Sequence, residues 1–253
     1  MHFLSEVAHW FTTGSNWSGS DGVLDRLVLQ IELSVVVVIA ASAIGVAIGY
    51  ALGHFRVGGF VAVNAANAAR AVPSLALLTL LAIWPLVSLK GDGFLAAFIT
   101  LVALAIPPVL TNAYVALREV DPDIIEAARS VGMSGLGRFL KVEVPLAVPL
   151  TVAGIRTAAV EVVATATLAA YVSFNDLGGF IFAGLNTNNS VETFSGAIVV
   201  ALLAGLTDLT LLGLYHLLMP APLRRTGASQ PEMRRGLGRV RAPRRAVLDS
   251  GVA

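Results

Sequence analysis

The chain has 253 residues, of which 56% are hydrophobic and 13% are charged, and its mean hydropathy is +0.80. This balance excludes an ordinary soluble domain and indicates an integral membrane protein. The formal net charge of +1 is unevenly distributed, because eight arginines against two acidic residues give the segment 219–253 a net charge of +6. No cysteine is present, which excludes disulfides, thiolate metal sites and cysteine nucleophiles.

Five apolar segments are long enough to cross a hydrocarbon layer of about 30 Å as helices of about 20 residues. They cover residues 27–52, 71–89, 94–117, 144–172 and 194–219. Because lipid offers no hydrogen bonds to the backbone, we predict an all-α integral membrane protein with about five transmembrane helices. Residues 1–26 lack the basic start and apolar core of a signal peptide, so we expect an uncleaved extracytoplasmic segment.

Glycines and prolines shape these apolar segments. Gly45, Gly49 and Gly53 form a GxxxGxxxG ridge in the first segment, which favours close helix packing, either within the chain or across a dimer. Prolines in the second, third and fourth segments remove helical donors and favour kinks. They are Pro73, Pro85, Pro107, Pro108 and Pro149.

The longest polar interruption, residues 118–143, predicts two short helices. Asp121 is placed to cap the first, Pro122 suits its first turn, and Gly132 supplies a left-handed stop. Ser134 is placed to cap the second helix, which we expect to end before Pro145.

The first of these loop helices has an apolar side. Ile124, Ile125, Ala128 and Val131 fall roughly on one face, although the loop should be solvated. Physical chemistry alone leaves two interpretations open. The helix packs on its own membrane domain, or the face binds a partner.

The basic residues predict the orientation. With the N-terminus outside and the C-terminus in the cytoplasm, thirteen basic residues lie on the cytoplasmic side and only Arg26 and Lys90 lie outside. The thirteen are Arg56, Arg118, Arg129, Arg138, Lys141 and the eight arginines after residue 219. The segment 220–253 is rich in arginine, glycine and proline, and we expect a disordered basic tail.

Charges inside the apolar segments are costly and usually face a partner or a cavity. Arg156 and Asp208 each lie eleven residues from the cytoplasmic end of their segment, which is about 16 Å along a helix. We therefore expect the two side chains to form an ion pair across the bundle.

The polar loop resembles the EAA signature of permease subunits of bacterial ABC importers. The glutamate and two alanines, the glycine that follows and the later proline stand at the family spacing. In that family the loop is a coupling helix that docks on the ATP-binding subunit. The resemblance implies this role for Ile124, Ile125, Glu126, Ala127, Ala128, Gly132 and Pro145.

Residues 70–78, 153–158 and 166–170 resemble permeases that import glycine betaine, choline and related osmoprotectants, and the resemblance extends over about 24–223. It implies a methionine-importer-like permease domain over 27–219 in the bacterial cytoplasmic (inner) membrane. It also implies a second permease, identical or related, two ATP-binding subunits and an extracytoplasmic binding protein, with no nucleic acid. Candidate path or gating residues are Arg70, Pro73, Ser74, Arg156, Glu161 and Asp208.

The chain has no phosphate-binding GxxxxGK[ST] loop, so we expect a non-catalytic subunit without a cofactor. ATP and magnesium would be bound by the partner subunit. The expected cargo is a quaternary ammonium compound. An amino acid or another small solute remains an alternative, and an ion-driven carrier or osmotic channel is a rival of another class, supported only by the intramembrane carboxylates.

Two positions depart from the family. Glu161 stands where the family is usually uncharged, and it either lines the path of a quaternary ammonium cation, pairs with Arg156, or is solvated. Residues 173–179 replace a glycine-rich stretch expected near the external gate and keep only Leu177 and Gly178 clearly.

Overall fold

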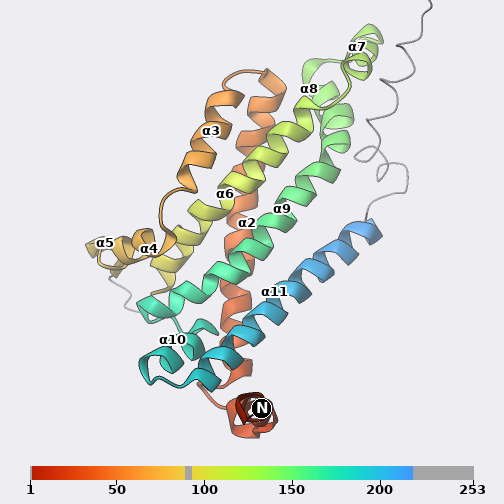
Figure 1. The fold of residues 1–253 in the computed structure, drawn as a ribbon. Helices are drawn as coiled ribbons and strands as arrows, with labels where there is room; N and C mark the ends of the chain where they lie inside the picture. Colours follow the sequence, from red (N-terminus) through yellow and green to blue (C-terminus); the bar gives the residue numbers. More distant parts are fainter. Residues whose placement is uncertain (1, 89–92, 219–253) are drawn as a thin grey trace, which may run out of the picture.

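The computed structural model describes residues 2–88 and 93–218 (Figure 1). Four long helices form the body of the bundle: α2 (Val23–Phe55), α6 (Phe94–Arg118), α9 (Val144–Ala166) and α11 (Ser190–Leu218). Helix α6 packs against both α2 and α9, and α11 packs against α9. No strand occurs within the described residues, so the predicted all-α fold is confirmed.

Four stretches are long and apolar enough to cross a membrane, namely Val23–Phe55, Phe94–Arg118, Gly135–Val172 and Ser190–Leu217. A fifth is added within the described ranges if the bent pair α3 (Gly59–Ala69) and α4 (Ser74–Ala82) is one span. The described part of the predicted segment 71–89 is not one continuous helix, because α4 ends at Ala82 and a new helical turn begins at Pro85. Helices α3 and α4 meet at 78°, and α5 (Pro85–Ser88) follows.

The break between α3 and α4 has a local cause. Pro73 precedes α4 with an extended backbone (φ −60°, ψ 118°). Its ring also disfavours helical backbone at Val72, so the chain turns here. Arg70 directly follows α3 and is thereby placed at the bend.

The two ends of the bundle differ (Figure 1). One end carries α7 (Pro122–Ser130) and α8 (Gly135–Arg138). The other carries α1 (His2–Thr12), η1 (Gly14–Asn16), η3 (Thr167–Val172) and α10 (Gly178–Asn186). Neither α1 nor α10 was predicted from the sequence. Both pack against α11, and α10 also packs against η3.

The glycine ridge packs within the chain. A Cβ atom added to Gly49 would lie 2.7 Å from the Cβ atom of Ala113 and 2.7 Å from the Leu110 carbonyl oxygen, both on α6. Gly45 and Gly53 approach α6 equally closely. The glycine ridge was expected to pack either within the chain or across a dimer, and in the structure it packs against α6 of the same chain. The predicted tail 220–253 lies outside the described residues.

Candidate functional site

Helix α7 is fixed at both ends by local hydrogen bonds. The Asp123 backbone N–H donates to the Asp121 carboxylate at 2.9 Å, and Pro122 occupies the first turn, as predicted. At the other end Gly132 is left-handed (φ +81°) and the Met133 N–H donates to the Ala128 carbonyl at 3.2 Å. This closure, with the Gly132 N–H bound to the Arg129 carbonyl at 2.9 Å, is a Schellman motif.

The second loop helix begins as predicted but ends differently. The Gly137 N–H donates to the Ser134 hydroxyl at 3.2 Å, which caps α8. The helix does not stop before Pro145. It continues through a π-helical turn, η2 (Phe139–Glu143), into α9, where Pro145 lies in the first turn. A proline is tolerated in the first turn of a helix. Pro145 has no backbone N–H to donate to the preceding turn, and the wider π-helical turn lies at this interruption of the hydrogen bonds.

The apolar face of α7 is divided between the chain and solvent. Ile125 and Ala128 are each only 8% exposed. Ile124 is 43% exposed and Val131 78% exposed. The buried half agrees with packing on the chain itself, and partner binding by the exposed half stays a prediction. Four large apolar side chains of the loop stand outward, and we call them the outer loop residues: Ile124, Val131, Leu136 and Leu140.

The remaining residues of the EAA-like signature are also at the surface. Glu126, Ala127 and Gly132 are exposed around α7, and Pro145 is exposed at the start of α9. A Cβ atom added to Gly132 would meet nothing within 4 Å, so only its backbone conformation requires glycine.

Arg156 and Asp208 are paired, as their spacing predicted. The guanidinium Nε and Nη2 atoms donate to the two carboxylate oxygens, each at 2.6 Å. This bidentate geometry is the strongest form of such a contact, and it joins α9 to α11 across the bundle.

Glu161 has a different partner from the one considered in the sequence. Arg156 is engaged by Asp208, and the Glu161 carboxylate lies 4.0 Å from the Arg70 guanidinium. Arg70 stands at the bend between α3 and α4. Both side chains of this loose pair remain more than a third exposed.

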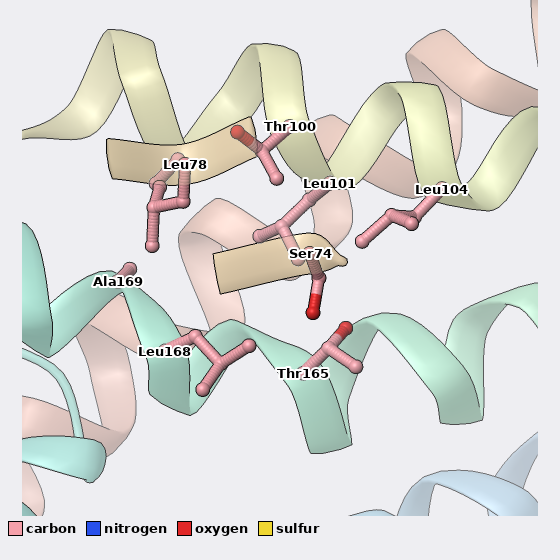
Figure 2. Close-up of a pocket in the computed structure, with 9 residues that line it drawn as sticks. Ser74, Leu78, Thr100, Leu101, Leu104, Thr165, Leu168 and Ala169 are labelled. Carbon is pink, nitrogen blue, oxygen red and sulfur yellow. The ribbon is translucent and has the colours of Figure 1, made fainter. Parts of the chain in front are cut away.

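A small pocket lies one turn further along these elements (Figure 2). The hydroxyl oxygens of Ser74, at the start of α4, and of Thr165, on α9, point toward one another among leucines. Thr165 also donates to the Glu161 carbonyl at 2.7 Å. The pocket volume of about 10 Å³ suits about one water molecule, so this conformation has no room there for an organic solute.

Together, these contacts form a polar strip across the bend. Residues 70 and 74 flank the break, with Pro73 at the start of α4, and they face residues 161 and 165, one helical turn apart on α9. Within residues 2–88 and 93–218, no group of three or more histidine, aspartate or glutamate side chains is placed to hold a metal ion.

Two buried carboxylates were missed by the sequence analysis. Glu143 binds His54 and Arg138 at the end that carries α7. Asp176 lies between η3 and α10, where its carboxylate accepts from the Gly178 N–H at 2.8 Å. Burial raises the pKa of the Asp176 carboxyl to about 7, opposed by that hydrogen bond and by the charge of Arg26.

Gln30 connects the segment around Asp176 to the bundle. It is fully buried on α2, donates to the Val163 carbonyl at 2.9 Å, and accepts from the Leu177 N–H at 3.1 Å. The only sequence signal for this contact was the departure of residues 173–179 from the family pattern.

Residues 41–223 match the model of the family described as "Binding-protein-dependent transport system inner membrane component". The glycine betaine/carnitine/choline transport system permease protein OpuCB of Bacillus subtilis is 31% identical over 72% of this chain and 82% of its own length. The carnitine transport permease protein OpuCB of Listeria monocytogenes is 36% identical over 79% of this chain and 91% of its own length.

Among solved structures, a chain of the MetNI methionine ABC transporter in inward facing conformations superposes with a TM-score of 0.68. The two chains are 21% identical, and the match covers 78% of this chain and 97% of the other. This likeness confirms the methionine-importer-like fold.

Proposed function

Because the chain belongs to the family of binding-protein-dependent transport system inner membrane components, we propose that it is the permease subunit of an ATP-driven importer for compatible solutes. The cargo is glycine betaine, choline, carnitine or a related quaternary ammonium compound, the class named for its relatives. A second permease, two ATP-binding subunits and an extracytoplasmic binding protein complete the complex.

The observation that carries the proposal is the divided face of α7. Its inner half is buried, its two ends are closed by caps, and it packs against α8 and η2, which lead into α9. Its outer half exposes apolar side chains that water does not favour. An apolar helix at one end of a membrane bundle suits a docking site for an ATP-binding subunit, and its displacement during ATP hydrolysis would drive the change between outward and inward facing states.

The charge distribution supports a cytoplasmic position for this end. Arg56 caps α2 here, Arg118 ends α6, and Arg129 and Arg138 lie in the last turns of α7 and α8. Basic residues favour the cytoplasmic side. The N-terminus and α10 then face outward, toward the binding protein.

We assign the polar strip to the translocation path. The charged side chains of the strip, Arg70 and Glu161, are partly exposed in an otherwise apolar part of the chain. Exposing a charged group to lipid is costly, so these side chains are expected to face an aqueous cavity. The Glu161 carboxylate would attract the quaternary ammonium group, and Arg70 would attract the carboxylate of a zwitterion such as glycine betaine. The Arg156–Asp208 pair holds α9 to α11 beside this path and acts in gating.

Docking is tested by charging the outer half of α7. Ile124→Asp and Val131→Asp leave the buried Ile125 in place and should lower the amount of ATP-binding subunit that copurifies with the permease about tenfold or more. Leu4→Asp puts the same charge on an exposed leucine at the opposite end and should not change it. Equal copurification of all variants would exclude α7 as the docking site.

The path assignment is tested by uptake of two solutes. Both solutes carry a quaternary ammonium group, so Glu161→Gln should reduce uptake of both. Only glycine betaine has a carboxylate, so Arg70→Gln should reduce uptake of glycine betaine more than that of choline. Unchanged uptake of both solutes by both variants would remove the polar strip from the path.

A further inference from the structure

Glu143 is a buried charge at the junction between the coupling loop and the membrane bundle. It is the last residue of the π-helical turn η2 and directly precedes α9, and it is only 4% exposed. A carboxylate in such a place is tolerated only when charged or hydrogen-bonding partners surround it. The partners of Glu143 therefore show which other segments are bound to the start of α9.

The two partners come from different segments. Arg138, the last residue of α8, donates from Nε to one carboxylate oxygen at 2.6 Å. His54, in the last turn of α2, bonds through Nδ1 to the other oxygen at 2.7 Å. The histidine is 89 residues away in the chain, so Glu143 links the coupling loop to the first transmembrane helix.

Aromatic contacts reinforce the same link. The Phe139 ring, on η2, lies 4.8 Å from the His54 ring and 6.3 Å from the Tyr50 ring, both on α2 and both edge-on. The Tyr50 hydroxyl is in turn 3.0 Å from the Thr151 hydroxyl on α9. The last two turns of α2 thus hold η2 and the start of α9 together. We call this group the clasp: Tyr50, His54, Arg138, Phe139 and Glu143.

Helix α2 reaches from the clasp to the opposite end of the bundle. There the buried Gln30 binds the Val163 carbonyl and the Leu177 N–H, next to the stretch expected near the external gate. A displacement of α7 can reach α2 through α8 and η2, which α7 contacts, and through α6, whose C-terminus precedes it. Because packed helices move as rigid units, an attachment at the clasp carries movement of η2 directly to α2, in addition to the route through α6.

We propose that Glu143 is a positioning residue for coupling: through Arg138 and His54 it fastens the coupling loop to α2, so that movement of the docked loop is transmitted to the outer end of the bundle. The inference rests on the proposed function, since it requires that the loop is moved by an ATP-binding subunit. Without the clasp, the loop still docks and ATP is still hydrolysed, but α2 follows the loop less closely and transport per ATP falls.

The test is the number of ATP molecules hydrolysed for each solute taken up by the complete complex in proteoliposomes, with radiolabelled glycine betaine as the probe. Glu143→Gln should reduce uptake about tenfold while ATP hydrolysis changes less than about twofold, within the range of typical coupling energies. The ratio of ATP hydrolysed to solute transported should therefore rise about fivefold or more.

A second variant separates coupling from folding. Arg138→Gln together with Glu143→Gln removes both charges and leaves none buried alone, so the complex should assemble in normal amounts and still show the raised ratio. Asp21→Asn neutralises an exposed carboxylate that lies 3.5 Å from Arg26 at the other end of α2, and it should leave the ratio unchanged.

Either of two results would overturn the inference: uptake and hydrolysis falling in proportion, as for a merely structural residue, or a normal ratio in both clasp variants beside an active wild-type complex. If the wild-type complex takes up nothing in response to ATP, the proposed function fails, and the inference with it. The wild-type measurement thus distinguishes the two failures.

Discussion

Replacing Gly49 by alanine would place a methyl group where the backbones of α2 and α6 meet. The added Cβ atom would lie 2.7 Å from the Leu110 carbonyl oxygen and 2.7 Å from the Ala113 Cβ atom. Ordinary contacts of these atoms are about 3.5–4.0 Å. The two helices must therefore separate locally by several tenths of an ångström or more, because neither atom belongs to a flexible side chain.

The cost follows from two opposing effects. Overpacking a close contact typically costs about 1–3 kcal/mol. Alanine is favoured over glycine inside a helix by about 1 kcal/mol, which offsets part of that cost. The net loss is at most about 2 kcal/mol, and at about 2–4 °C for each kcal/mol in a chain of this length, Tm should fall by up to about 8 °C.

The assay is thermal unfolding of the purified permease in detergent, with Gly213→Ala as the matched control. Gly213 lies in α11, and a Cβ atom there meets nothing within 4 Å, so this variant should keep or raise Tm. If Gly49→Ala raises Tm as much as Gly213→Ala does, the close contact between α2 and α6 is refuted.

Three further outcomes are expected. Asp208→Asn should lower uptake by leaving Arg156 without its carboxylate, and adding Arg156→Gln should restore part of it; full uptake by both single variants would contradict a gating role. Gly132→Ala should cost about 1–2 kcal/mol through its left-handed backbone and weaken copurification of the ATP-binding subunit, whereas Gly132→Asn should lie between alanine and glycine. Because the folded pKa of Asp176 is raised to about 7 from 3.8, the folded protein binds this proton more tightly than the unfolded chain, so stability falls as pH rises from about 4 to 7. Asp176→Asn should flatten that part of a plot of Tm against pH, and an unchanged slope would show that another group is responsible.

Local features of the candidate site were predictable from the sequence. The caps at Asp121 and Ser134 and the stop at Gly132 depend on neighbouring residues alone, and the structure contains all three. The Arg156–Asp208 pair was predictable because intramembrane charges at equal depth need one another.

Features that depend on distant partners were not predictable. The apolar composition of residues 71–89 predicts a membrane segment but says nothing about the direction of the chain. It could not reveal the 78° bend between α3 and α4, at which Arg70 lies near Glu161. In the sequence, Glu143 is one of several charged residues in a polar loop. Its importance depends on a histidine 89 residues earlier, which only the packed bundle brings within 2.7 Å.

The central claim is most directly tested by uptake of radiolabelled glycine betaine and choline into proteoliposomes that hold this chain with its copurifying ATP-binding subunits and binding protein. ATP inside the liposomes, on the side of the nucleotide subunits, should stimulate uptake of at least one of the two solutes when the binding protein is outside. Uptake that is driven by a proton gradient without ATP would contradict the account, and ATP hydrolysis without uptake of either solute would contradict the assigned cargo.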